Sequence, residues 1–289
     1  MRNIGEMLAQ DGNALQQNLS LTAAEARSEV QTLLQHVLTV NRAWLLAHPE
    51  QIPDAGRQAA YVKLLQRRLG GEPIAYILGE REFFGLKFKV TPATLIPRPE
   101  TELLVELALA HLPPQGRVLD LGTGSGAIAL AIAHARPGAQ VTAVDASAAA
   151  LEVARQNAQG LGLVNVRCMH SDWFAALADE RFDLIVSNPP YVAAGDTHLA
   201  QGDLRFEPRT ALTSGADGLD DIHRIIAGAS AHLDTNGWVL LEHGYDQAAV
   251  IRSLLLSDGF EQVFSETDLS GIERVSGGRV ADTVRSGGI

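Results

Sequence analysis

A short polar and proline-rich stretch, Ser187-Asn188-Pro189-Pro190-Tyr191, directly follows the apolar run FDLIV. Proline has a fixed φ angle and no N–H group, and it pushes the preceding residue toward an extended backbone. The stretch is therefore stiff, cannot be helical and presents carbonyl groups without matching donors. One interpretation is a loop that only ends a strand. The other is a rigid set of hydrogen-bond acceptors for a ligand that carries an NH₂ group.

A second stretch, VLDLGTGSGA, places Gly122, Gly124 and Gly126 between a predicted strand and a predicted helix. Glycine permits positive φ angles and lets a ligand approach the backbone closely. Asp145 ends the next predicted strand, where a carboxylate can accept hydrogen bonds from ribose hydroxyls. We therefore predict a nucleotide-containing ligand. Two structural alternatives stay open, since the glycines can serve the turn alone and Asp145 can cap the helix that follows.

The glycines of this turn fit two ligand patterns. With Ala127 they match G-x-G-x-x-G/A, the pattern of dinucleotide-binding proteins. With Asp120 in front they match D-x-G-x-G-x-G, which resembles the first motif of S-adenosylmethionine-dependent methyltransferases. The second pattern is favoured by a predicted antiparallel pair of C-terminal strands, similar to the end of that methyltransferase fold, and by the acceptor stretch after the fourth strand.

Two residues after the third predicted strand also face the expected ligand. The strand VRCMH is followed by Ser171, Asp172 and Trp173, and the carboxyl ends of parallel strands face the ligand crevice. Asp172 can accept a hydrogen bond from an adenine amino group, and Trp173 can stack on the ring. Core packing is the alternative explanation for Trp173, because large aromatic side chains are commonly buried.

Strands and helices alternate after Pro114, which predicts a parallel sheet covered on both faces. Strands are expected at 116–122, 140–146, 166–172, 182–188 and 238–244, and helices at 125–135, 147–162, 217–237 and 245–259. The last two strands, 260–268 and 274–281, have no helix between them. They must be antiparallel, because a parallel crossover needs a dozen or more residues.

The first part of the chain has a different pattern. Residues 1–80 read as a helical domain, in which Thr22 and Glu25 form a capping-box pattern. Residues 81–100 read as a β-hairpin linker, and residues 101–289 as the ligand-binding domain. Within LIPRPETE, Arg98 and Glu100 can belong to an arm that closes over the site or to a plain surface linker.

Composition excludes several classes of function. Asp plus Glu outnumber Lys plus Arg by 34 to 23, a net charge of −11, so we expect no direct nucleic-acid partner. The single cysteine, Cys168, permits no internal disulfide or cysteine-based zinc site and fits a reducing cytoplasm. The nine histidines show no ligand spacing, so we expect no metal. Neither a signal peptide nor a membrane span is predicted.

The motif at 188–191 resembles that of methyltransferases acting on planar nitrogens, such as adenine N6, cytosine N4 and glutamine amides. From about residue 25 to 280, the chain is similar to the glutamine methyltransferases of peptide-chain release factors. The helical N-terminal region and the stretches GEREFFGLKFKV, LIPRPETE and DLSGIERVSGGR carry this resemblance. It implies S-adenosyl-L-methionine as cofactor, and the glutamine in the Gly-Gly-Gln loop of a release factor as substrate. We expect a cytoplasmic monomer.

The resemblance also implies a fold and a set of contacts. The fold is α/β, a Rossmann-like class I methyltransferase sheet of seven strands with the last one antiparallel, preceded by the helical domain and the hairpin. The resemblance implies cofactor contacts at Gly122, Thr123, Gly124, Ser125, Gly126, Asp145, Trp173 and Asn188. Asp172 is added to this set because it follows the strand VRCMH. Substrate contacts are expected at Asn188, Pro189, Pro190 and Tyr191.

The residue types in the motif suit the chemistry of an amide nitrogen, whose delocalised lone pair makes it a poor nucleophile. A site can accept both N–H groups, one at Asn188 Oδ1 and one at the Pro189 carbonyl, and so aim the nitrogen at the methyl group. We assign the catalytic role to these two residues. The prolines keep the acceptors rigid, and Tyr191 can cover the flat face of the substrate.

Three rival functions fit the sequence less well. An adenine-N6 nucleic-acid methyltransferase would share the motif but needs a basic target-recognition region, which an acidic chain lacks. A nicotinamide oxidoreductase needs a residue that handles a hydride substrate, and none stands out. A non-catalytic protein with a vestigial fold is disfavoured by the intact acceptor motif.

Overall fold

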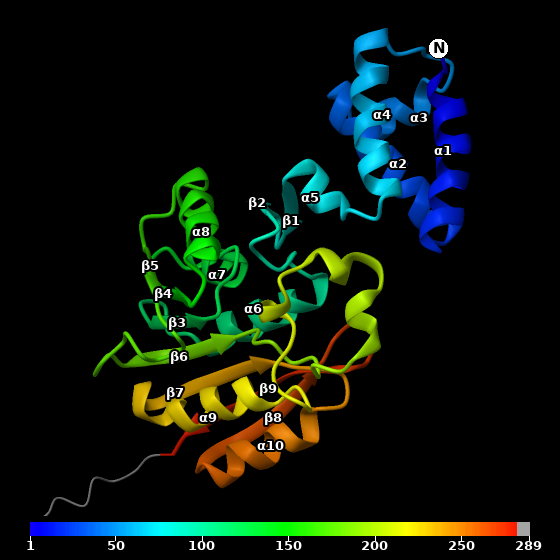
Figure 1. Cartoon of the computed structure of the whole chain (residues 1–289). Helices are drawn as coiled ribbons and strands as arrows, with labels where there is room; N and C mark the ends of the chain where they lie inside the picture. The colour runs from blue at the N-terminus through cyan, green and yellow to red at the C-terminus, as the bar shows by residue number, and fades with distance from the viewer. Residues whose placement is uncertain (282–289) are drawn as a thin grey trace, which may run out of the picture. The chain divides into compact units, whose positions relative to one another are not determined.

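The computed structural model describes residues 1–281, and these form two compact units (Figure 1). The first unit consists of Met1–Glu80 together with Thr197–Phe206, and the second of Arg81–Asp196 and the chain from Glu207. The C-terminal stretch from residue 282, to which the sequence assigned no role, lies outside the described residues. No described helix is long and apolar enough to cross a membrane.

Five helices build the first unit, as the sequence pattern predicted for a helical domain. They are α1 Ile4–Leu19, α2 Ala23–Leu38, α3 Arg42–Ala47, α4 Ala55–Leu69 and α5 Ile74–Leu78. The predicted capping box of Thr22 and Glu25 is present at the start of α2, and Asn3 and Glu6 form another on α1. Leucine and isoleucine side chains from these helices make one apolar core.

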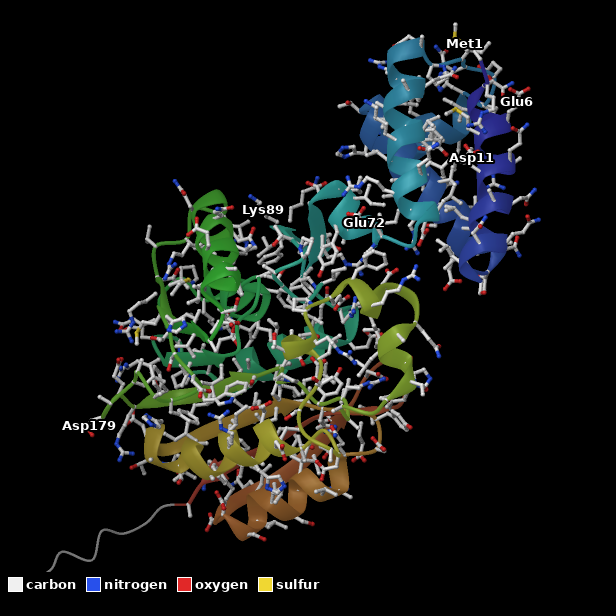
Figure 2. The ribbon with its side chains drawn as sticks, viewed as in Figure 1. Met1, Glu6, Asp11, Glu72, Lys89 and Asp179 are labelled. Carbon is white, nitrogen blue, oxygen red and sulfur yellow. The ribbon has the colours of Figure 1, made fainter. Side chains whose placement is uncertain are left out.

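Buried polar side chains join parts of the first unit that are distant in sequence. Asp11 points from α1 toward α4 (Figure 2), where it accepts a hydrogen bond from the Tyr61 hydroxyl at 2.9 Å. Arg68 of α4 is almost fully buried and pairs with Glu29 of α2 and with Asp203. Asp203 lies in the segment Thr197–Phe206, which follows the Asn-Pro-Pro-Tyr motif in the chain. Arg68 therefore ties that segment to the helical unit.

The second unit begins with the predicted hairpin, formed by β1 Glu80–Phe83 and β2 Leu86–Lys89. Gly85 in its turn has a φ of 73°, a conformation that glycine adopts without strain. Phe83 and Phe88 are buried and pack edge to face with ring centroids 6.1 Å apart. Their rings join the apolar core beneath one face of the main sheet.

The main sheet has seven strands in the order β5-β4-β3-β6-β7-β9-β8. Its strands are β3 Arg117–Leu121, β4 Gln140–Asp145, β5 Val166–His170, β6 Phe182–Ser187, β7 Leu233–Glu242, β8 Phe260–Thr267 and β9 Glu273–Val280. The pairings from β5 to β7 are parallel, and β9 is antiparallel to both of its neighbours. The predicted fold class is confirmed, including the antiparallel last strand.

Helices cover both faces of this sheet, as predicted (Figure 1). They are α6 Glu102–His111, α7 Ala127–Ala135 and α8 Ala148–Gly160 on one face, and α9 Asp220–His232 and α10 Ala248–Ser257 on the other. Two apolar clusters, one on each side of the sheet, fill the space between strands and helices.

The predicted boundary between the helix 217–237 and the strand that follows it is wrong. The predicted helix 217–237 ends at His232, and β7 begins at Leu233, which pairs with Phe182 of β6. The next pair in the ladder joins Leu184 to Trp238, so residues 234–237 bulge out of the sheet. Asn236 takes a φ of 65° within this bulge. The polar residues DTNG therefore lie inside a strand, where the sequence suggested the end of a helix.

Candidate active site

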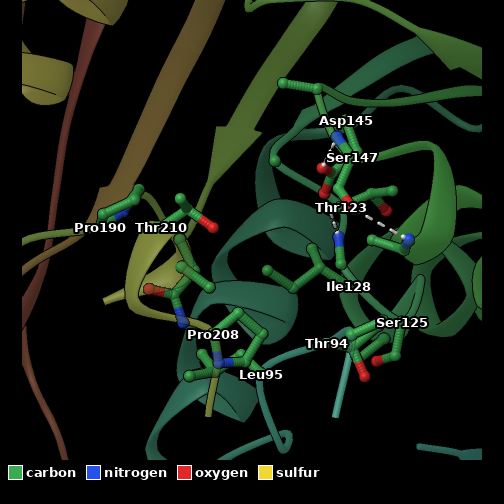
Figure 3. Close-up of a pocket in the computed structure, with 18 of the residues that line it drawn as sticks. Thr94, Leu95, Thr123, Ser125, Ile128, Asp145, Ser147, Pro190, Pro208 and Thr210 are labelled. Carbon is green, nitrogen blue, oxygen red and sulfur yellow. Dashed lines mark hydrogen bonds between the residues drawn. The ribbon is translucent and has the colours of Figure 1, made fainter. Parts of the chain in front are cut away.

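A cavity of about 620 Å³ opens at the carboxyl ends of the central strands (Figure 3). β3 lies between β4 and β6, so the strand order changes direction there. Open α/β sheets bind their ligands at such a switch point. Pro190 and Thr210 lie on one side of the cavity, and Asp145 and Ser147 on the other (Figure 3). All of its lining residues belong to the second unit.

The glycine-rich turn links β3 to α7 with three positive φ angles, 71° at Gly122, 57° at Gly124 and 85° at Gly126. A Cβ atom on Gly126 would lie 3.0 Å from Leu130 Cδ1 and 3.3 Å from Ala154 Cβ, so this glycine allows two helices to pack closely. A Cβ atom on Gly124 would meet nothing within 4 Å. Gly124 therefore lies against open space in the cavity, as a ligand-contacting glycine must.

Asp145 holds the turn from the end of β4. Its Oδ2 accepts a hydrogen bond from the Gly124 N–H at 2.8 Å, and its Oδ1 accepts one from the Ser147 N–H at 2.7 Å. The N-cap of α8 is Ser147 and not Asp145, since the Ser147 hydroxyl accepts from the Ala150 N–H. Burial raises the pKa of Asp145 above its usual value, and the two backbone hydrogen bonds oppose this shift. The carboxylate also lines the cavity.

Asp120 is a buried acid at the base of the same turn. Its Oδ2 accepts hydrogen bonds from the Thr123 hydroxyl at 2.6 Å and from the Ala129 N–H at 3.2 Å. Its Oδ1 has no hydrogen-bond partner among the described residues. Burial raises the pKa of Asp120 to about 7. The motif pattern singled out this acid, and the structure shows that it supports the turn from below.

Asp172 and Trp173 line the cavity beyond β5. Both carboxylate oxygens of Asp172 lie 2.9 Å from one guanidinium nitrogen of Arg224. Trp173 has a φ of 48° and donates from Nε1 to Asp221 at 3.1 Å. Its ring lies against Gly122 and also packs on the apolar cluster of the sheet. The structure thus brings Trp173 to the cavity wall and to the core at once.

The Asn-Pro-Pro-Tyr motif follows β6, beside the glycine-rich turn. Ser187 pairs with Leu121 in the sheet, and its hydroxyl donates to the Leu121 carbonyl at 2.7 Å. Asn188 and Pro190 line the cavity, whereas Pro189 is buried behind them. Asn188 Nδ2 donates to the Thr101 hydroxyl at 3.2 Å. No described residue hydrogen-bonds to Asn188 Oδ1, which leaves this acceptor available.

Tyr191 is not among the residues that line the cavity. Its hydroxyl donates to Glu242 Oε1 at 3.5 Å, and its carbonyl accepts from Gln247 Nε2 at 3.1 Å. Gly218 must be glycine here, because a Cβ atom would lie 2.2 Å from the Tyr191 carbonyl oxygen. Burial raises the pKa of Tyr191 above its usual value. In this structure Tyr191 fixes the backbone of the motif, while a role in covering the substrate stays a prediction.

Sequence reasoning missed several residues around the cavity. They are Thr101, Glu207, Asp221, Arg224 and Glu242. Arg98 forms an ion pair with the buried Glu207, so LIPRPETE is anchored beside the motif and is not a plain surface linker. No local pattern marks these residues, because their partners lie in distant parts of the chain.

Comparisons with known proteins agree with this geometry. Residues 99–207 match the model of the methyltransferase small domain, and residues 13–79 match that of the PrmC N-terminal domain. A 16S rRNA N2 G1207 methyltransferase of T. thermophilus, solved in complex with AdoMet and guanosine, is 23% identical with a TM-score of 0.53. The alignment covers 70% of this chain and 50% of that one. The chain therefore has the fold of the methyltransferase class.

Two relatives are much more similar in sequence. A release factor glutamine methyltransferase of Bordetella pertussis is 56% identical over 87% of this chain and 94% of its own. The protein-(glutamine-N5) methyltransferase (release factor-specific) of Alicyclobacillus acidocaldarius is 34% identical over 67% of this chain and 99% of its own, with a TM-score of 0.40. The chain belongs to the release factor glutamine methyltransferase family.

Proposed function

We propose that the protein methylates the side-chain amide nitrogen of the glutamine in the Gly-Gly-Gln loop of peptide-chain release factors, with S-adenosyl-L-methionine as methyl donor. The observation that carries this proposal is the acceptor at Asn188. Its Oδ1 has no partner among the described residues, it follows a central strand, and it shares the cavity with the glycine-rich turn. The printed names of the close relatives support the same substrate class.

The residues of the cavity fit S-adenosylmethionine. A cavity of about 620 Å³ is within the usual range for a ligand of this size. Asp145 presents a carboxylate for the ribose hydroxyls, and each oxygen keeps a lone pair after its backbone hydrogen bond. Gly124 leaves open space for close approach, and the Trp173 ring forms part of the wall. When bound, the cofactor supplies an electrophilic methyl group on a sulfonium.

The motif residues would help the amide nitrogen to react by holding it in the correct orientation. Asn188 Oδ1 and the Pro189 carbonyl accept the two N–H groups, which orients the nitrogen and stabilises the positive charge that develops on it. Held in this way, the nitrogen would take the methyl group that a bound cofactor would supply, and it would then lose one proton to water. Pro189 and Pro190 keep both acceptors in place, because their φ angles are fixed.

The charge of the chain favours a protein substrate over a nucleic acid. A net charge of −11 repels phosphates, whereas nucleic-acid enzymes need clustered cations. Arg224, which lines the cavity, is already paired with Asp172 and Asp221. Glycines beside the target glutamine would let the loop backbone come close to the cavity without a side-chain clash.

The test compares four substrates with labelled cofactor: an intact release factor, its Gln→Ala variant, a short loop peptide, and DNA that contains adenine. We expect strong labelling of the intact factor, weak labelling of the peptide, and no labelling of the Gln→Ala variant or the DNA. The peptide must lose roughly 1–2 kcal/mol of conformational entropy per residue that becomes fixed. Label in the DNA, or equal label in the Gln→Ala variant, would refute the proposal.

A further inference from the structure

Trp173 has a backbone conformation that few aromatic residues adopt. Its φ is 48°, which lies in the left-handed region where a Cβ atom crowds the backbone. The Ser171 hydroxyl holds this conformation, since it donates to the Trp173 carbonyl at 2.7 Å and accepts from the Ala176 N–H at 3.0 Å. Strained residues of this kind persist only where neighbouring contacts fix them, and they cluster at ligand sites. The fold therefore tolerates backbone strain to hold Trp173 in place.

The indole ring of Trp173 reaches from the glycine-rich turn to helix α9. At its six-membered end, a Cβ atom built on Gly122 would lie 3.4 Å from Cζ3 and 3.6 Å from Cη2. At its five-membered end, Nε1 donates to Asp221 Oδ1 at 3.1 Å, and Asp221 is the second residue of α9. Nε1 is the only polar atom of an indole, and it can only donate. Asp221 therefore selects one orientation of the ring, because a rotated ring would lose this hydrogen bond.

Asp221 is itself held by its neighbours. Its Oδ2 accepts from the Ser214 hydroxyl at 2.8 Å, and its N–H donates to Ser214 Oγ at 2.7 Å. Ser214 is 2% exposed, and its N–H donates at 3.0 Å to the carbonyl of Val192, the residue that follows the Asn-Pro-Pro-Tyr motif. Arg224 adds an ion pair at 3.4 Å. With Oδ2 fixed by Ser214, Oδ1 faces Trp173.

We propose that Asp221 is a positioning residue for the cofactor: it accepts the Trp173 N–H and so holds the indole ring in the cavity wall, where the ring can stack on a planar base. The inference rests on the proposed function, since Trp173 is an expected contact of S-adenosylmethionine. Asp221 is part of the cavity lining as well. A direct contact between its carboxylate and the cofactor is therefore the rival explanation, and it makes different predictions.

The contribution of Asp221 is to order the ring before the cofactor binds. Without this acceptor the Trp173 ring gains other orientations, which the bound cofactor must then restrict. Ordering a side chain on binding opposes association, so the affinity falls. A hydrogen bond to a charged group changes an equilibrium constant by about 10- to 150-fold, which sets the upper limit. The expected loss is smaller than this limit, because Ser171 and Gly122 still contact Trp173.

A small set of variants separates positioning from direct contact. Asp221→Ala removes the acceptor, whereas Asp221→Asn keeps one, because its amide oxygen can accept from Trp173 while its NH₂ group donates to Ser214 Oγ. Trp173→Phe keeps an aromatic ring without the N–H, and it is combined with Asp221→Ala in a double variant. Asp183→Ala is the matched control. Asp183 is a half-buried aspartate near the amino end of β6, and its Oδ2 accepts from the Arg117 N–H at 2.7 Å.

In Asp221→Ala, we expect the Kd of S-adenosylmethionine to rise at least about fivefold, and less than about 150-fold, in calorimetry. At saturating cofactor, kcat for release-factor methylation should stay within about threefold, because the lost interaction serves binding and not the reaction. Asp221→Asn should keep the Kd within about threefold of the wild type, and Asp183→Ala should leave it unchanged. On the Trp173→Phe background, Asp221→Ala should change the Kd less than about twofold, because its effect passes through the missing N–H.

Three outcomes of these titrations would overturn the proposal. An unchanged Kd in Asp221→Ala would show that the ring needs no acceptor. A Kd in Asp221→Asn as weak as in Asp221→Ala would show that the charge of Asp221 matters and not the hydrogen bond from Trp173. Losses that multiply in the double variant would assign Asp221 to a direct contact with the cofactor.

A second measurement needs neither cofactor nor turnover. The indole N–H signal of Trp173 in NMR, identified by its loss in Trp173→Phe, should exchange slowly with water in the wild type, in Asp183→Ala and in Asp221→Asn. In Asp221→Ala the exchange should be about tenfold faster or more, because the hydrogen bond is missing. An unchanged exchange rate would refute the positioning role. If the wild type does not bind S-adenosylmethionine, the proposed function fails, while this measurement still decides the role of Asp221.

Discussion

Replacing Asn188 by alanine is the most direct perturbation of the proposed chemistry. The change removes Oδ1, which no described residue engages, and Nδ2, which makes one hydrogen bond of 3.2 Å to Thr101. Loss of that single bond lowers the free energy of unfolding by about 1 kcal/mol. The fold and the glycine-rich turn should therefore persist, and the main effect should fall on the reaction.

The expected kinetic loss follows from the role of Oδ1. A preorganised hydrogen bond to a group on which charge develops contributes about 10²–10³ in kcat, or roughly 2.7–4 kcal/mol. The interaction is strongest in the transition state, so kcat should fall far more than cofactor affinity. For Asn188→Ala we thus expect kcat to decrease about 100- to 1,000-fold and the Kd of S-adenosylmethionine to change less than about threefold.

Asn165→Ala provides the matched control. Asn165 Nδ2 lies within 3.3 Å of three backbone carbonyls, of Ala133, Arg136 and Ala139, near the amino ends of the strands. This variant should lose stability, by about 1–3 kcal/mol, with little change in kcat. Single-turnover methylation, isothermal titration with the cofactor and thermal unfolding separate the two patterns. An Asn188→Ala enzyme that keeps most of its turnover would show that Asn188 only ends a strand.

Three further variants test other parts of the molecule. Asp145→Ala should weaken S-adenosylmethionine binding about 10- to 150-fold in calorimetry, because hydrogen bonds to a charged group contribute about 1.5–3 kcal/mol. An unchanged affinity would show that Asp145 does not belong to the cofactor site. Gly124→Ala should cost about 1–2 kcal/mol in unfolding experiments through its φ of 57°, and a methyl group in the open cavity should lower cofactor affinity as well. Arg68→Leu leaves Glu29 and Asp203 without their cation. The segment that carries Asp203 should become protease-sensitive, and release-factor methylation should fall while cofactor affinity stays constant. Retained protease resistance would show that other contacts hold this segment.

Local patterns in the sequence predicted most of the fold. The alternation of strands and helices after Pro114, and the helix-free last strand pair, specified the sheet and its antiparallel β9, because crossover geometry allows few alternatives. The bulge at residues 234–237 was not predictable in the same way. It depends on pairing between β6 and β7, and the tertiary contact overrides the local preference of DTNG for a turn.

The sequence also located the cavity but not its polar network. Gly122 and Asn188 each follow a strand and Asp145 ends one, so their meeting at one edge of the sheet follows from parallel topology. Glu242 ends a strand as well, yet nothing in the sequence marks it as the acceptor of the Tyr191 hydroxyl. Long-range partners of this kind cannot be found by periodicity or motif spacing.

The orientation of Asn188 shows why motif residues alone do not define a site. The motif provides an amide at the correct edge of the sheet, but an amide has a donor end and an acceptor end of nearly equal shape. In the structure the NH₂ end of Asn188 donates to the Thr101 hydroxyl, a contact that comes from outside the motif. A chain that kept Asn-Pro-Pro-Tyr and lost Thr101 would retain the motif without this contact to Asn188. Its expected defect is a loss of turnover with normal cofactor binding.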